Sequence, residues 1–247
     1  AELAQRFQSQ AGRFGARIVQ DSVTGVDFSD RPFSIRTDRG DYRAQAVIVA
    51  TGAAPRRLGI PGEDKFYGRG VSSCATCDGF FYRDKHVIVV GGGDSAVDEA
   101  IFLTKFAEKV TIIHRRAELR ATKIYQEKAM ANPRIDFIWN SVVEEILGDQ
   151  TVTGVRVQNV KTQETDMVKA DGVFVYIGME PKSDVFDGQL EVDDRGYIVS
   201  DGQQRTNIPG VFVAGDVQDP HYRQVVIAAG TGAAAAMEAE RFLGKYP

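Results

Sequence analysis

The sequence predicts an α/β fold in which one nucleotide-binding domain is inserted into another. Short apolar runs alternate with helical patterns, which is typical of parallel sheets covered by helices. A strand, a glycine-rich turn, a helix and a second strand follow one another over about 30 residues, the order of a βαβ unit. Two other strands end in similar motifs, Ala50-Thr51-Gly52 and Ala214-Gly215-Asp216, and the βαβ unit lies between them. We therefore expect the chain to cross between domains near residues 53–57 and 178–183.

The outer domain draws its elements from both ends of the chain. Apolar residues at helical spacing predict a helix over residues 1–14. Runs bounded by Gly and Asp predict a small antiparallel meander with strands at 17–19, 25–28, 33–37 and 42–44. The continuous apolar runs 46–50 and 211–214 predict buried strands, the first covered on both faces. An alanine-rich helix is expected at 230–243.

The inner domain contains the βαβ unit and the elements that follow it. Buried strands are expected at 86–90 and 110–113, with a helix at 95–107 between them. A second helix is expected at 123–131, followed by strands at 136–139, 154–159 and 172–177.

Composition excludes several classes of function. A net charge of -4 does not favour nucleic acid or an anionic membrane as a partner. The longest apolar runs, at 87–90 and 225–229, are far too short to span a bilayer. We therefore expect neither a nucleic acid nor a membrane among the partners.

The only two cysteines, Cys74 and Cys77, are three residues apart. A secreted disulfide scaffold would distribute more cysteines along the chain. A zinc site would need two further ligands, and the three histidines show no ligand spacing, so no metal is expected. The spacing therefore favours a redox-active pair. Asp78 follows directly and suits a proton donor or acceptor, or else a helix cap or turn residue.

A dinucleotide-binding fingerprint follows the strand at 86–90. Its glycines would allow backbone N–H groups to approach a pyrophosphate at a helix N-terminus. The alternative is a plain, tight strand–helix turn. The residues concerned are Gly91, Gly92, Gly93, Asp94, Ser95 and Ala96.

Basic residues follow the next strand, where a protein that binds NAD would carry an acidic residue. They are His114, Arg115 and Arg116, with Arg120 one turn later. Guanidinium groups suit a 2′-phosphate because each donates bidentate, charge-assisted hydrogen bonds. The position favours NADP(H), and the alternative is a solvated basic surface.

Two further segments are candidates for ligand contact. Gly215-Asp216 ends a strand and could bind a sugar hydroxyl, or form an ordinary turn. His221-Tyr222-Arg223-Gln224 precedes a helix of small residues, where a ligand could approach the backbone closely or the helix could simply pack tightly.

Taken in order, these motifs resemble the low-molecular-weight thioredoxin reductases, a class of pyridine nucleotide-disulfide oxidoreductase. The resemblance implies an FAD-binding domain of residues 1–54 and 184–247, and an inserted NADPH-binding domain of residues 55–183 that carries the redox disulfide. The family begins with a strand–GxGxxG–helix that is not found before Cys74, so we expect the N-terminal FAD-binding segment to be missing and the FAD domain to be incomplete. The matching residues are 50–53, 74–79, 91–96, 114–116 with Arg120, 209–217 and 222–224.

The resemblance also implies a role for each candidate residue. Electrons would pass from NADPH through FAD and the Cys74–Cys77 disulfide to thioredoxin, with Cys77 facing the flavin, Cys74 attacking thioredoxin and Asp78 as the acid–base group. The inserted domain would rotate about the two crossings. The enzyme would be a cytoplasmic homodimer. NADPH would contact residues 91–96, His114, Arg115, Arg116 and Arg120, and FAD would contact Thr51, Gly52, Gly215, Asp216, Arg223, Gln224 and Val225.

Two other functions remain open from the sequence. A flavoprotein reductase subunit that serves a peroxiredoxin would share these motifs and carry a further thioredoxin-like N-terminal region. A non-catalytic nucleotide-binding fragment would explain the glycines and arginines but would leave the cysteine pair and Asp78 unexplained.

Overall fold

A computed structural model describes residues 2–245 of the chain, which form two compact units. One unit is Ala54–Glu180, and the other combines the residues up to Ala53 with those from Pro181 onward. The α/β prediction is confirmed, because the five-stranded sheet is parallel and helices connect several of its strands. Within the described residues, no helix combines the length and the apolar character needed to cross a membrane.

The unit Ala54–Glu180 is built on a five-stranded parallel sheet. Its strand order is β6-β13-β7-β8-β9, so β13, late in the chain, lies between β6 and β7. Both partners of β13 are parallel to it, with Phe174 opposite Ser72 on one side and Val89 on the other. The strands are β6 (Val71–Ser72), β7 (His86–Val90), β8 (Lys109–His114), β9 (Ile135–Trp139) and β13 (Gly172–Val175).

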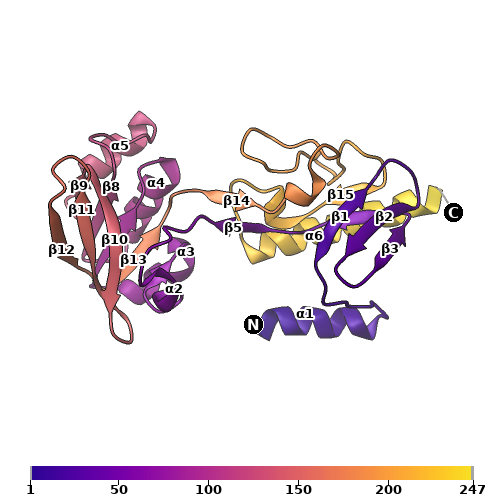
Figure 1. The fold of residues 1–247 in the computed structure, drawn as a ribbon, viewed down its shortest axis with the longest axis horizontal. Coiled ribbons are helices and arrows are strands. Elements are labelled where there is room, and N and C mark those ends of the chain that lie inside the picture. The colour runs from indigo at the N-terminus through magenta and orange to yellow at the C-terminus, as the bar shows by residue number, and fades with distance from the viewer. Residues whose placement is uncertain (1, 246–247) are drawn as a thin grey trace. The chain divides into compact units, whose positions relative to one another are not determined.

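Each face of this sheet is covered by a different layer (Figure 1). Helices α4 (Asp94–Leu103) and α5 (Lys123–Met130) lie in one apolar cluster with Val87 and Phe174. The opposite cluster joins Ile88 and Ile113 to an antiparallel sheet of β10 (Ser141–Gly148), β11 (Val152–Asn159) and β12 (Thr165–Lys169). The sequence analysis found only part of β11 among these three strands. The remaining short elements are α2 (Glu63–Phe66), α3 (Ala75–Asp78) and η1 (Gly79–Tyr82).

Gly91 allows β7 to turn into α4 directly beside β13. Its φ is 151°, a conformation that residues with a side chain rarely adopt. A Cβ at Gly91 would lie 2.4 Å from the carbonyl oxygen of Tyr176 and 2.7 Å from the Cβ of Ala96. The close approach of this turn to the neighbouring strand therefore requires glycine.

The other unit packs small sheets against a long helix. β1 (Val23–Asp27), β2 (Phe33–Thr37) and β3 (Asp41–Ala44) form an antiparallel meander, and β4 (Val47–Val49) pairs in parallel with β15 (Val211–Val213). Helix α6 (Val225–Lys245) packs on β15 through Ala235 and Phe242. The remaining helices are α1 (Glu2–Arg13), η2 (Asp184–Phe186) and η3 (Gly215–Val217). β5 (Ala53–Pro55) and β14 (Met179–Pro181) pair at the two places where the chain passes between the units.

Three expectations for this unit are corrected by the structure. Residues 17–19 are not a strand, and Ile18 and Val19 stay exposed because no described strand pairs with them. Strand β4 is not covered on both faces, because Val49 is buried whereas Ile48 is 40% exposed. Helix α6 begins at Val225, five residues earlier than expected.

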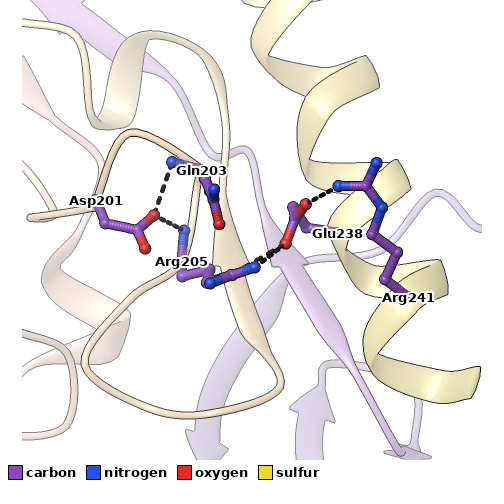
Figure 2. A network of polar contacts seen from close by, with 5 residues as sticks. All are labelled: Asp201, Gln203, Arg205, Glu238 and Arg241. Atoms are coloured by element: carbon purple, nitrogen blue, oxygen red, sulfur yellow. Dashed lines mark hydrogen bonds and ion pairs between the residues drawn. The ribbon is translucent and has the colours of Figure 1, made fainter. Parts of the chain in front are cut away.

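An ion-pair network fastens α6 to the loop before β15 (Figure 2). The buried carboxylate of Glu238 accepts hydrogen bonds from Arg205 on the loop and from Arg241 one turn later on the helix. Asp201 in turn accepts the backbone N–H groups of Gln203 and Arg205, which shapes the loop. The hydrogen bond from Arg205 lowers the pKa of Glu238 more than burial raises it, and the hydrogen bond from Arg241 lowers it further.

We predict that Glu238→Gln makes the free energy of unfolding of the chain less dependent on pH in the acid range. Because the folded pKa of Glu238 is lowered, its stabilising contribution is complete above the ordinary pKa of glutamate and is lost as pH falls through the folded pKa. The variant should be less stable than the parent at neutral pH, and the difference should shrink on acidification. Urea unfolding followed by circular dichroism at a series of pH values measures this. Glu240→Gln, at an exposed position of the same helix, is the control, and equal behaviour of the two variants would contradict the prediction.

We predict that Gly91→Ala lowers the free energy of unfolding of its unit by about 1–3 kcal/mol, the usual cost of overpacking. The matched control is Gly93→Ala, because φ there is -91° and a Cβ would meet nothing closer than Arg120 at 3.9 Å. That change should cost less than about 1 kcal/mol, since only a helix-cap preference is altered. Fluorescence of Trp139, the single tryptophan, reports this unit during urea unfolding. Equal losses in both variants would show that the contact with Tyr176 does not select glycine.

Candidate active site

Cys74 and Cys77 form a disulfide at the start of α3. Cys74 is half-buried and Cys77 is exposed, so the bond is within reach of a reaction partner. The Sγ of Cys74 accepts the backbone N–H of Cys77 at 3.2 Å and the hydroxyl of Thr76 at 3.3 Å. In residues 2–245, no three His, Cys, Asp or Glu side chains gather in a way that could hold a metal ion. The pair is therefore closed as a disulfide whose first sulfur lies among hydrogen-bond donors.

Ser72 connects the disulfide segment to Asp78. This serine ends β6 and is only 6% exposed. Its hydroxyl donates to Oδ2 of Asp78 at 2.6 Å and accepts the backbone N–H of Cys74 at 3.0 Å. The sequence analysis missed Ser72, because a two-residue strand leaves no periodic pattern by which to recognise it.

Tyr176, which follows β13, connects the disulfide segment to the glycine-rich turn. Its hydroxyl accepts the backbone N–H of Ala75 at 2.6 Å. Its carbonyl oxygen is the atom that faces Gly91. Because β6, β13 and β7 are adjacent and parallel, their carboxyl ends bring the disulfide and the glycine-rich turn to the same edge of one sheet. The sequence analysis also missed Tyr176, since nothing near it in the sequence indicates that β13 lies between β6 and β7.

A pocket of about 400 Å³ opens at this edge. The first two fingerprint glycines and part of the basic segment at the end of β8 contribute to its wall, together with Arg56 and Arg57 from the start of the unit. Arg116 is exposed and is not among the lining residues. The lining residues used below are Gly91, Gly92, His114, Arg115, Arg120 and Tyr176.

The rest of the fingerprint shapes the entrance to α4. Gly93 precedes the helix, and the carboxylate of Asp94 accepts the backbone N–H of Thr122 at 2.6 Å. This bond fixes the first turn of α4 to the start of α5. Ser95 is exposed, whereas Ala96 is buried and is the small residue that faces Gly91.

His114 lies buried beneath the glycine-rich turn. Burial lowers its pKa, and the nearby charges of Arg120, Arg116 and Arg115 lower it further, so the imidazole is neutral at neutral pH. A Cβ at Gly92 would fall 2.4 Å from the imidazole ring. Among the described residues, its buried Nε2 has no hydrogen-bond partner. A bare glycine backbone, an orphaned imidazole nitrogen and adjacent guanidinium groups fit a phosphorylated nucleotide.

A second group of candidate residues gathers in the other unit. Strands β4 and β15 are parallel, so the residues that follow them lie at the same edge of the sheet. These residues are Thr51 and Gly52 after β4, and Gly215 and Asp216 after β15. The hydroxyl of Thr51 donates to the carbonyl of Lys182 at 2.5 Å. Burial raises the pKa of Asp216, with a smaller contribution from Asp219, and its carboxylate makes no hydrogen bond to any described residue. An unpaired, half-buried carboxylate at a strand end fits a sugar or ribitol hydroxyl.

Asp219 holds the turn that leads into α6. Its carboxylate accepts the backbone N–H groups of His221, Tyr222 and Arg223. These bonds lower the pKa of Asp219 although burial opposes the shift. Arg223 adopts a φ of 48° in this turn, Gln224 follows it, and Val225 begins α6 with 65% of its surface exposed. The turn places these three residues beside the strand end that carries Asp216.

Comparison with known proteins identifies the family of this chain. A family model for pyridine nucleotide-disulphide oxidoreductases matches residues 5–232. A thioredoxin reductase of Rickettsia bellii is 53% identical over 248 residues, which cover 98% of this chain and 80% of that protein. A thioredoxin reductase of Streptomyces clavuligerus is 50% identical over 244 residues, which cover 98% of this chain and 76% of that protein.

The solved structures agree with the sequence relatives. The thioredoxin reductase of Streptococcus pyogenes superposes with a TM-score of 0.93 at 44% identity, covering 99% of this chain and 80% of that one. Such identity over nearly all of this chain shows common family membership. The chain therefore belongs to the pyridine nucleotide-disulphide oxidoreductases and, within them, to the thioredoxin reductases, whose cofactors are FAD and NADPH.

Proposed function

We propose that this chain acts as a thioredoxin-disulfide reductase whose reacting disulfide is Cys74–Cys77. The observation that carries the proposal is the position of this disulfide, which shares one edge of a parallel sheet with the nucleotide pocket. When bound, NADPH would supply a hydride and FAD would pass its two electrons on to the disulfide. We further propose that the enzyme is a cytoplasmic homodimer and that its partner is thioredoxin.

We propose that the unit Ala54–Glu180 binds NADPH. The backbone N–H of Gly92 is the one offered to the pyrophosphate, because that of Gly91 donates to the carbonyl of Ile113 at 3.2 Å. Gly93, Asp94, Ser95 and Ala96 form the entrance to α4. Arg115 and Arg120 hold the 2′-phosphate, with Arg116 beside them at the exposed rim. Neutral His114 offers its free ring nitrogen below the turn. Arginine suits this role because its guanidinium keeps its charge and pairs with two phosphate oxygens at once.

We propose that the other unit binds FAD. Thr51, Gly52, Gly215 and Asp216 lie at one edge of β4 and β15, and the Asp216 carboxylate suits a ribitol hydroxyl. Arg223, Gln224 and Val225 lie at the start of α6, held by Asp219, and suit the flavin ring. The backbone N–H of Gly215 is itself held by the hydroxyl of Thr231, which keeps this strand end in place.

The residues around the disulfide suit thiol–disulfide exchange with a protein. The N–H of Cys77 and the hydroxyl of Thr76 both point at Cys74 Sγ, and such donors stabilise negative charge on a sulfur that attacks another disulfide. Asp78 follows Cys77 directly, and in this proposal it exchanges a proton with the cysteine pair. Phe80 and Phe81, directly after α3, are 60% and 69% exposed and offer an apolar contact surface for a protein substrate.

We predict that replacing Arg115 and Arg120 together by Gln weakens binding of NADPH far more than binding of NADH. Each charge-assisted hydrogen bond contributes about 1.5–3 kcal/mol, so the dissociation constant of NADPH should rise about 100-fold or more. The constant for NADH should change by less than about threefold, because NADH lacks the 2′-phosphate. Isothermal titration calorimetry measures both constants.

Two single variants complete this test. Lys128→Gln removes an exposed charge on α5 outside the pocket and should leave both constants unchanged. Arg116→Gln decides whether the arginine at the rim contributes. Equal weakening of NADPH and NADH by the double variant would contradict the assignment of the 2′-phosphate site.

We predict that Cys74 is the sulfur that attacks thioredoxin. Cys77→Ser leaves Cys74 as the only thiol, and Cys74→Ser leaves Cys77. With a thioredoxin carrying an activated mixed disulfide on its active-site cysteine, the Cys77→Ser variant should couple about tenfold faster or more, because the attacking sulfur must carry the thiolate charge. Release of the chromophoric leaving group measures the rate. Both variants should lose turnover with thioredoxin and keep flavin reduction by NADPH in the flavin-loaded protein. Faster coupling through Cys77 would mean that the two roles are reversed.

A further inference from the structure

Ser72 is fixed in place by the sheet, independently of the disulfide. It pairs with Phe174 of β13, a fully buried residue at the centre of the apolar core. The serine itself is 6% exposed. Its hydroxyl therefore projects from a rigid strand end toward the segment that carries the cysteines.

That single hydroxyl serves two groups of the redox centre at once. A serine hydroxyl has one proton to donate and two lone pairs that accept. Here the proton is directed at Asp78 Oδ2 at 2.6 Å, and a lone pair accepts the N–H of Cys74 at 3.0 Å. If Ser72 served only to accept the N–H of Cys74, the hydrogen bond to Cys74 would be explained but the one to Asp78 would not. The first bond reaches six residues along the chain to the carboxylate that follows Cys77.

We propose that Ser72 is a positioning residue of the redox centre: its hydroxyl couples the Asp78 carboxylate to the backbone of Cys74 and holds the acid beside the disulfide. This inference rests on the acid–base role proposed above for Asp78. Reduction of the disulfide breaks one S–S bond, takes up two electrons supplied through NADPH and FAD, and requires two protons to leave two thiols. Both protons come from solvent: Asp78 takes up one and passes it to a cysteine sulfur, and the other reaches the second sulfur directly. The hydroxyl of Ser72 donates to the Asp78 carboxylate that remains once the proton has been passed on. When the substrate disulfide then oxidises the pair, the substrate S–S bond breaks and takes up the two electrons and two protons, and the Cys74–Cys77 bond forms again.

The test is the rate at which dithiothreitol reduces Cys74–Cys77 in the full chain, followed by alkylation of the free thiols and mass measurement. Ser72→Ala should slow the reduction about tenfold, and Asp78→Asn at least as much, since a positioned proton donor contributes factors of this order or larger. Because both residues act as one unit, the double variant should match Asp78→Asn within about twofold. Independent, structural effects would multiply instead.

Two matched variants separate positioning from general damage. Ser73→Ala makes the same chemical change one residue later, where the hydroxyl is hydrogen-bonded to that of Tyr67, and should stay within about twofold of the parent. Ser72→Thr keeps the hydroxyl and should restore the rate. A second measurement leaves Ser72 untouched: Asp78→Asn should speed hydrogen exchange at the Cys74 amide about tenfold, because the bridge that protects this amide loses its charged end. This measurement decides the question even if Ser72→Ala does not fold.

The outcomes distinguish this inference from the function on which it rests. A slow Asp78→Asn with a normal Ser72→Ala would overturn the role of Ser72 and leave that of Asp78 standing. A double variant about tenfold slower than Asp78→Asn would also overturn the coupling. If Asp78→Asn reduces at the parent rate, the acid–base role of Asp78 fails, and the inference about Ser72 fails with it.

Discussion

The parallel pairing of β13 between β6 and β7 is the constraint on which the redox site depends. The whole disulfide segment lies between β6 and β7 in the sequence, and β13 follows β7 by about 80 residues. Bringing β13 between them closes a long loop of the chain, which costs conformational entropy. The register of β13 places its Phe174 opposite Ser72 of β6 on one side and opposite Val89 of β7 on the other. Tyr176 then follows at the sheet edge, where its hydroxyl meets Ala75 and its carbonyl meets Gly91. One strand thereby sets the spacing between a disulfide and a nucleotide pocket.

Local pattern was enough to predict the elements that carry the chemistry. The β7–α4–β8 unit depends on apolar periodicity and on a glycine-rich turn, both of which are short-range signals. Strand β7 begins and ends where it was expected, at His86 and Val90. The cysteine spacing likewise indicated a disulfide, because three residues can span one helical turn and both sulfurs then meet at its start. These features need no knowledge of distant neighbours.

The features that sequence reasoning missed are those that depend on distant neighbours. Strands β10 and β12 gain their stability from pairing with β11, and polar residues interrupt both of them, so neither forms a continuous apolar run. Ser72 and Tyr176 matter only because β13 brings them to the same edge. At residues 17–19 a strand was predicted that does not form. The composition there is typical of a strand, but no described strand pairs with it and Ile18 stays exposed. A strand is defined by its hydrogen-bonded neighbour, and local composition cannot supply one.

The two candidate nucleotide sites differ in the charge that they present to a ligand: arginine guanidinium groups in one, and the carboxylate of Asp216 in the other. In the pocket after β7, burial and three arginines keep His114 neutral, so the positive charge resides on guanidinium groups that cannot lose their protons. At the end of β15, burial and Asp219 raise the pKa of Asp216, so this carboxylate gains by accepting a hydroxyl hydrogen bond. The first arrangement is suited to the phosphate proposed for it, and the second to the proposed sugar or ribitol chain. Glu238 shows the contrast within the same unit, because its buried carboxylate is already paired with Arg205 and Arg241 (Figure 2). A carboxylate thus serves packing where arginines pair with it, and is available for binding where burial leaves it unpaired.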